Sequence, residues 1–146
     1  MIHVRDLTKS YADLRRGQFL ALRGVTFDVR PGQIYGLLGP NGAGKTTVLR
    51  ILSTVLQPTS GRVRVAGFDV VRQPSLVRRQ IGFMSANTAV YDRMTAWEMV
   101  AYFGRLYGMA DDRIAARTEE LSELLDMGAF IDRRCDSLST GQGQKV

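Results

Sequence analysis

The sequence predicts an α/β fold in which a mixed core sheet is combined with an antiparallel β part and a helical part. Residues 2–5, 25–30 and 62–65 alternate apolar and polar side chains, the period of half-buried antiparallel strands. The run Ile34–Leu38 is continuously apolar, which suits a parallel strand covered on both faces. A glycine-rich loop over residues 39–47 and a helical repeat follow it. With 146 residues, 45% of them hydrophobic, the chain is long enough for one domain with its own core.

The first third of the chain predicts strands separated by turns. Leu7–Arg23 is a polar stretch between the first two strands, with a turn candidate at Arg16-Gly17. Arg30-Pro31-Gly32 predicts a turn into the apolar run, because proline presets one turn dihedral and glycine tolerates the next.

After the glycine-rich loop we expect a helix that packs one face on the sheet and ends at Gln57–Gly61. The apolar face of this helix comprises Val48, Ile51, Leu52, Val55 and Leu56. Pro74 introduces a short helix over Ser75–Gln80, and Ile81–Met84 predicts another short strand.

Two further helices are expected in the second half. Thr95 caps a helix over about 96–108, because Glu98 stands three residues later at capping-box spacing. This helix is apolar on most sides, so it is either buried or meets a partner. The next helix follows Asp111-Asp112. Its apolar face comprises Ile114, Thr118, Leu121, Leu124 and Leu125.

Composition excludes several classes of protein. The net charge is +6, but the basic pairs are scattered and no basic run carries interleaved aromatics, so nucleic acid is not the expected partner. No apolar run approaches the roughly 20 residues of a membrane span, and the N-terminus has no signal-peptide pattern. We therefore expect a cytoplasmic chain. The single cysteine, Cys135, predicts a small, partly buried side chain, and the lone His3 supports neither a zinc site nor a Ser/His triad.

The glycine-rich loop predicts a phosphate-binding site. It reads Gly39, Pro40, Asn41, Gly42, Ala43, Gly44, Lys45, Thr46 and Thr47. Its glycines let backbone N–H groups curl toward a polyphosphate, the helix start adds partial positive charge, and Lys45 supplies a full charge that stabilises the transferred phosphate. Thr46 can offer its hydroxyl to magnesium. An ordinary glycine turn is the alternative, which the flanking strand and helix patterns disfavour. A dinucleotide-binding fold is disfavoured because no Gly-x-Gly-x-x-Gly surrounds the loop.

A second motif stands near the C-terminus, in Leu138-Ser139-Thr140-Gly141-Gln142. In isolation it predicts no more than a helix N-cap. About a hundred residues after a phosphate loop and with two helices between, it resembles the signature sequence of ABC-transporter ATP-binding subunits. Residues 39–47 match that family's phosphate loop throughout, and the resemblance spans essentially the whole chain.

The resemblance implies a P-loop NTPase fold of the ABC type, with ATP and Mg²⁺ as ligands. Tyr11 falls where the family places an aromatic that stacks on adenine, and a loop tyrosine covering the sheet edge is the alternative. Ser139, Gly141 and Gln142 would act in trans on nucleotide held by a second ATP-binding subunit, identical or related. A transmembrane permease would be the other partner, at the cytoplasmic face of the membrane.

In family terms, the whole chain is one partial ATP-binding domain. Residues 1–94 form the nucleotide-binding core and antiparallel β part, 95–137 the helical subdomain, and 138–146 the signature motif. The helical subdomain of the family touches the membrane partner, so the apolar helix near Trp97 is expected close to a protein interface.

Two departures from the family pattern affect the expected activity. The family has a glutamine after the strand that resembles Ile81–Met84, but here Ala86 stands there, and Asn87 follows as a candidate substitute. This loss resembles the branch of sodium-exporting ABC ATPases.

The second departure concerns catalysis. No Asp-Glu pair ends an apolar run, so the magnesium-binding Asp, the catalytic Glu and the later switch histidine of the family are missing. We therefore expect a C-terminally truncated chain that binds ATP without efficient hydrolysis, from a parent ATPase of an exporter. The alternatives are a non-catalytic nucleotide-binding fragment and an ABC ATPase that acts on nucleic acid or the ribosome.

Overall fold

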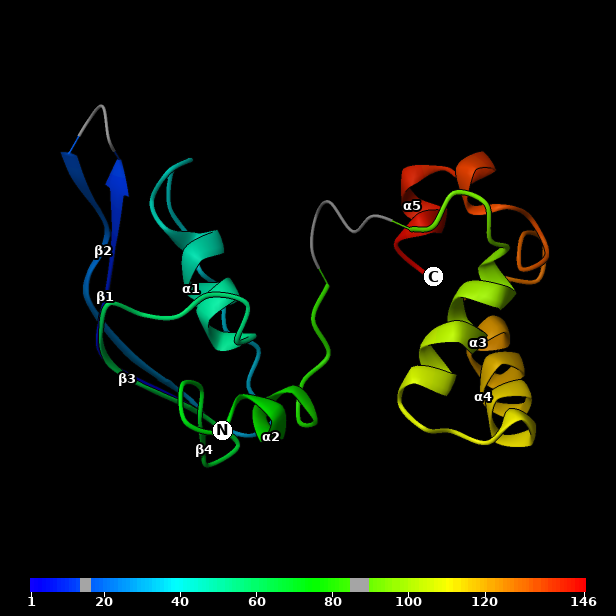
Figure 1. Ribbon diagram of the computed structural model, residues 1–146, viewed down its shortest axis with the longest axis horizontal. Helices are drawn as coiled ribbons and strands as arrows, with labels where there is room; N and C mark the ends of the chain where they lie inside the picture. The colour runs from blue at the N-terminus through cyan, green and yellow to red at the C-terminus, as the bar shows by residue number, and fades with distance from the viewer. Residues whose placement is uncertain (14–16, 85–89) are drawn as a thin grey trace. The chain divides into compact units, whose positions relative to one another are not determined.

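The computed structural model describes residues 1–13, 17–84 and 90–146. The chain forms two compact units, Met1–Phe83 and Met84–Val146 (Figure 1), which we describe separately.

The first unit is built on a four-stranded antiparallel sheet. Its strands are β1 (Ile2–Asp13), β2 (Gly17–Val29), β3 (Ser60–Val65) and β4 (Phe68–Asp69), in the order β2-β1-β3-β4. Val4 lies opposite Phe27 on one neighbour and Val63 on the other. The predicted alternation therefore places its apolar side chains on one face of the sheet.

Two helices accompany this sheet, α1 (Lys45–Leu52) and α2 (Pro74–Arg78). Val48 and Ile51 are the buried residues of α1, as its spacing predicts, and α2 confirms the short helix expected after Pro74. The buried core of the unit consists of Val4, Leu7, Leu22, Val48, Ile51, Val63, Val65, Val70 and Val77. Val55, expected on the buried face of α1, is exposed because the helix ends at Leu52, before Val55 is reached.

The β1–β2 hairpin is much longer than predicted. Within Leu7–Arg23, expected as a polar connection, residues 7–13 and 17–23 form most of both strands, and Leu7 and Leu22 are buried. Register shifts between Val4 and Thr8 break the alternation of β1, which is why a strict two-residue period missed this part of the strand. Arg16 of the predicted turn lies outside the described residues.

Two predicted strands are corrected by the structure. Ile34–Leu38 and Ile81–Met84 are not strands, and no described residue forms a backbone hydrogen bond with Ile34–Leu38. Ile34 and Leu38 are 103% and 95% exposed. A parallel strand forms only beside a partner strand, and the described sheet is antiparallel throughout. The parallel part of the predicted mixed sheet is therefore not formed by these residues.

The second unit is helical. It contains α3 (Ala96–Leu106), α4 (Asp111–Leu124), the 3₁₀ turn η1 (Cys135–Ser137) and α5 (Thr140–Gly143). The predicted capping box is confirmed, with the Thr95 hydroxyl accepting from the Glu98 amide at 3.1 Å and Glu98 Oε2 accepting from the Thr95 amide at 2.8 Å. A Cβ atom on Gly104 would lie 2.8 Å from Ile114 Cγ1, so α3 and α4 pack closely.

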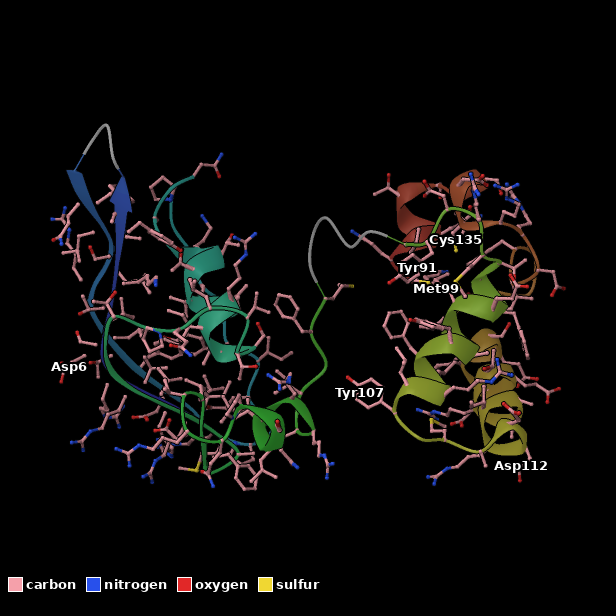
Figure 2. All side chains as sticks on the ribbon, in the orientation of Figure 1. Asp6, Tyr91, Met99, Tyr107, Asp112 and Cys135 are labelled. Carbon is pink, nitrogen blue, oxygen red and sulfur yellow. The ribbon has the colours of Figure 1, made fainter. Side chains whose placement is uncertain are left out.

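Burial within the helical unit differs from the sequence expectation in places. Ile114 and Thr118 of α4 are buried as predicted, but Leu124 is 74% exposed because α4 ends there. On α3, only the small or flexible residues Ala96, Met99 and Ala101 are buried. Tyr107 projects from the end of this helix and is 75% exposed (Figure 2). None of the helices in the described ranges is long and apolar enough to cross a membrane.

Candidate phosphate-binding site

Residues 39–44 form a tight loop, and residues 45–47 are the first residues of α1. Gly44 is the N-cap of the helix, with φ 89° and ψ 3°. Gly42 likewise has a positive φ of 85°. Residues with a Cβ atom rarely adopt these dihedrals, so the path of the loop depends on glycine. The Ala43 amide donates to the Pro40 carbonyl at 3.2 Å and closes the turn.

One side of the loop packs against β2. A Cβ atom on Gly44 would lie 2.8 Å from the Ala21 carbonyl oxygen and 2.6 Å from Leu22 Cδ2, whereas one on Gly42 would meet nothing within 4 Å. Sequence reasoning missed this support from β2. The apolar run from Phe19 to Leu22 was the signal that could have found it.

The open side of the loop carries unpaired N–H groups. No acceptor among the described residues bonds the amides of Gly42, Gly44, Lys45 or Thr46. The first turn of α1 contains no acidic residue, so no local carboxylate neutralises the positive end of the helix dipole. Four free amides and an uncompensated helix start form a site for an anion with several oxygens.

The Lys45 ammonium group is held over this loop. Its Nζ donates to the carbonyl oxygens of Gly39 at 2.6 Å and Pro40 at 2.8 Å. Two of the three ammonium hydrogens are therefore used within the loop, and the third is available to a ligand. The loop thus orients its own cation.

The chain contributes one oxygen to a possible magnesium site. Thr46, at the start of α1, carries an exposed hydroxyl beside Lys45. Across the described ranges, no group of three or more His, Cys, Asp or Glu side chains could hold a metal ion. Magnesium keeps several waters and binds readily to phosphate oxygens. A single hydroxyl therefore fits an ion that is held mainly by a bound polyphosphate.

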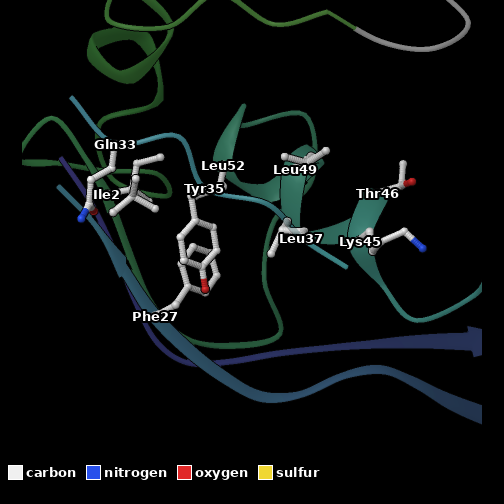
Figure 3. Close-up of a pocket in the computed structure, with 10 residues that line it drawn as sticks. Ile2, Phe27, Gln33, Tyr35, Leu37, Lys45, Thr46, Leu49 and Leu52 are labelled. Atoms are coloured by element: carbon white, nitrogen blue, oxygen red, sulfur yellow. The ribbon is translucent and has the colours of Figure 1, made fainter. Parts of the chain in front are cut away.

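A cavity of about 530 Å³ lies beside α1 and reaches Lys45 and Thr46 (Figure 3). The rings of Phe27 and Tyr35 stack in it with centroids 5.1 Å apart, and Lys45 and Thr46 lie at one end. It is lined by Ile2, Phe27, Val29, Gln33, Tyr35, Leu37, Lys45, Thr46, Leu49 and Leu52. Because most of these walls are apolar, the cavity does not suit a phosphate group. The backbone amides of the loop are therefore the better site for an anion.

Tyr11 lies on the hairpin that supports the loop. It faces Phe19 of β2 across the ladder, and Lys9 Nζ lies 5.2 Å from its ring centroid. The ring is 38% exposed. Tyr11 on β1 and the loop therefore belong to the same unit, and the loop packs against β2, the strand that pairs with β1.

The second motif forms a capped turn in the helical unit. The Ser139 hydroxyl accepts from the Gln142 amide at 3.3 Å, and Gln142 Oε1 accepts from the Ser139 amide at 3.0 Å. This confirms the N-cap interpretation of Ser139. Its hydroxyl keeps its own hydrogen to donate, and a Cβ atom on Gly141 would meet open space. Loop and turn belong to different units of the chain.

Two other sequence predictions concern the helical unit and the segment before it. Cys135 is expected to be small and partly buried, and the structure buries it almost completely; desolvation raises the pKa of its thiol. Ala86 and Asn87, where the family glutamine was sought, lie outside the described residues.

Comparisons with known proteins agree on one family. The model of the family described as ABC transporter matches residues 22–146. The ABC transporter ATP-binding protein NatA of Bacillus subtilis is 42% identical over 147 residues, covering 100% of this chain and 59% of NatA. The doxorubicin resistance ATP-binding protein DrrA of Mycobacterium tuberculosis is 38% identical, covering 98% of this chain and 42% of DrrA.

The solved structures show the same fold. The dimeric, post-hydrolysis ATP-binding cassette MJ0796 bound to ADP and Pi superposes with a TM-score of 0.85 at 26% identity, covering 99% of this chain and 66% of that one. The predicted P-loop α/β fold of the ABC type is thereby confirmed, although the described strands form only the antiparallel part of the predicted mixed sheet. The chain spans about 59% of the length of NatA and 42% of DrrA. Over the residues compared, the chain belongs to the family of ABC transporter ATP-binding subunits.

Proposed function

We propose that this chain binds ATP with Mg²⁺ through residues 39–47. The observation that carries the proposal is the set of free amides on Gly42, Gly44, Lys45 and Thr46, with the Lys45 ammonium held over them. These amides bind phosphate oxygens, and the third hydrogen of Lys45 stabilises negative charge on the terminal phosphate. Tyr11 stacks on the adenine base, and Thr46 contacts the magnesium ion.

The Ser139 turn acts on a second subunit in this proposal. The free hydroxyl hydrogen of Ser139, the open space at Gly141 and the cap formed by Gln142 suit contact with phosphate oxygens bound elsewhere. The dimeric state of the MJ0796 cassette with ADP and Pi supports such an arrangement. The partner is a second ATP-binding subunit, identical or related.

We further propose that the parent protein is an ATPase that drives a membrane exporter from the cytoplasmic face. The drug-resistance name of DrrA supports export, and the similarity to NatA supports transport. Residues 95–137 act as the helical subdomain that meets the permease, and the exposed aromatic residues of α3 support this role. Assignment to the sodium-exporting branch stays a prediction, which ion efflux by the full transporter in vesicles would test.

Nucleotide titration of purified protein tests the binding proposal. We expect Lys45→Ala to weaken Mg-ATP binding roughly tenfold to a hundredfold, because charge-assisted hydrogen bonds to phosphate are lost. Arg79→Ala is the matched control, since it removes an exposed cation from the same unit without touching the loop. Equal affinity of wild type and Lys45→Ala would exclude the loop as the nucleotide site.

A further inference from the structure

Lys145 makes a long-range contact within the helical unit. Its Nζ donates to the Leu125 carbonyl oxygen at 2.6 Å, and Leu125 is the C-cap of α4. The contact therefore joins the segment just after α5 to the end of a different helix.

The end of α4 lacks a cation of its own. Its last turn contains no basic residue, and Glu123 adds a negative charge close to the carbonyl end of the helix dipole. Asp126 follows with φ 51°, so the helix stops at this point. The amides of Leu125, Asp126 and Met127 satisfy the carbonyls of Leu121, Glu123 and Ser122, and the Leu125 carbonyl accepts from Lys145. A positive charge is favourable at this position, and Lys145 supplies it.

Backbone hydrogen bonds also hold the segment that precedes the Ser139 turn. Before the turn, the buried Cys135 donates its amide to the Met94 carbonyl at 2.8 Å, and Asp136 donates to Asp92 at 3.3 Å. The four residues of α5 contribute no buried side chain of their own. The turn is thus anchored at Cys135 on one side and at Lys145 on the other.

We propose that Lys145 is a positioning residue that fixes the Ser139–Gln142 turn against the end of α4. This inference rests on the proposed function in one respect, namely that the turn contacts nucleotide bound to a second subunit. The ammonium group of Lys145 does not itself touch nucleotide. It holds the backbone from which the Ser139 hydroxyl projects.

Amide hydrogen exchange tests the anchor without requiring nucleotide. In Lys145→Met, exchange at Gly141, Gln142 and Gly143 is expected to rise roughly three- to tenfold, because a charge-assisted contact that suppresses local opening is removed. Lys145→Arg keeps charge and reach and restores slow exchange. Gln144→Met is the matched control, because Gln144 is exposed and its side chain forms no hydrogen bond with a described residue.

A second measurement connects the anchor to recognition. Lys145→Met is expected to weaken ATP-dependent association of two copies several-fold, measured by sedimentation, while the affinity of each copy for Mg-ATP and the thermal midpoint stay unchanged. Lys145→Arg restores association.

The inference is overturned if exchange in Lys145→Met equals that of wild type, or if Gln144→Met raises it equally. It is also overturned if exchange rises throughout the unit with a lower thermal midpoint, which would show a general structural role, or if association is unaffected. Failure of the wild type to bind Mg-ATP or to associate would instead contradict the proposed function, and the exchange measurement would still decide the role of Lys145.

Discussion

Thr54 adopts a backbone conformation that β-branched side chains rarely take. Its φ is 63°, just after α1, and its hydroxyl accepts from Arg78 Nη1 at 2.9 Å. The left-handed region places the Cβ atom too close to the following carbonyl, at a cost of about 1–2 kcal/mol. An exposed side-chain hydrogen bond contributes about 0.5–1.5 kcal/mol, so it offsets part of this cost.

We expect Thr54→Gly to stabilise the first unit by about 1 kcal/mol, because glycine adopts the same dihedral without strain. Denaturant unfolding measures the change. Thr54→Val removes the same hydrogen bond but keeps a β-branched side chain at this position and leaves the Arg78–Ser75 bond intact, so it measures the stability lost with the hydrogen bond alone. Destabilisation of both variants to the same extent would show that the bond outweighs the strain.

Asp28 gives the sheet a defined pH dependence. Its carboxylate accepts from Arg5 at 2.7 Å and contacts His3 Nδ1 at 2.6 Å, and these two bonds, Arg5 first, lower the pKa of Asp28 below its ordinary 3.8. A carboxyl group whose folded pKa is depressed stabilises the protein above its unfolded pKa. That contribution is lost as the pH falls below 3.8 and through the folded pKa.

Wild type is therefore expected to be more stable than Asp28→Asn near neutral pH, and this difference should shrink below about pH 4. Unfolding titrations at several pH values measure it. High salt should reduce the difference because the group is exposed. A difference that grows on acidification would contradict the assignment.

At the scale of elements, the phosphate loop and β2 act as one assembly. Gly42 and Gly44 share a positive φ, but only Gly44 approaches β2. Their alanine substitutions therefore separate the cost of the dihedral from the cost of packing.

Gly42→Ala is expected to destabilise the first unit by about 1–2 kcal/mol through its backbone alone. Gly44→Ala should cost about 1–3 kcal/mol more, because its Cβ would collide with the Ala21 carbonyl, and a backbone atom cannot turn aside as a side chain does. Equilibrium unfolding compares the two variants. Equal losses would mean that β2 does not support the loop.

At the scale of the whole molecule, nucleotide binding and nucleotide cleavage need different residues. Lys45 and the loop amides can hold phosphate, whereas no Asp-Glu pair ends an apolar run among the 14 acidic residues of the sequence. We expect the 146-residue chain to bind ATP without efficient turnover. Phosphate release, with Lys45→Ala as the blank, measures this. A lysine-dependent rate well above the blank would contradict the expectation.

The sequence by itself determined the features that depend on neighbouring residues. The glycine-rich turn before α1, the capping box at Thr95, the N-cap at Ser139 and the alternation of Val63 and Val65 were all predicted and found. These signals are local, because capping and turn formation involve residues within one turn of each other. The family resemblance, which the comparisons confirmed, rested on such local motifs.

Only the tertiary structure decided what lies beside each element. It extended β1 over residues 7–13 and β2 over residues 17–23, placed Ala21 and Leu22 against Gly44, and joined Lys145 to Leu125. It also left Ile34–Leu38 without a partner strand among the described residues, although its apolar pattern predicts one. Strand pairing and side-chain contacts join residues far apart in the chain, and a periodic pattern carries no information about which partner will be there.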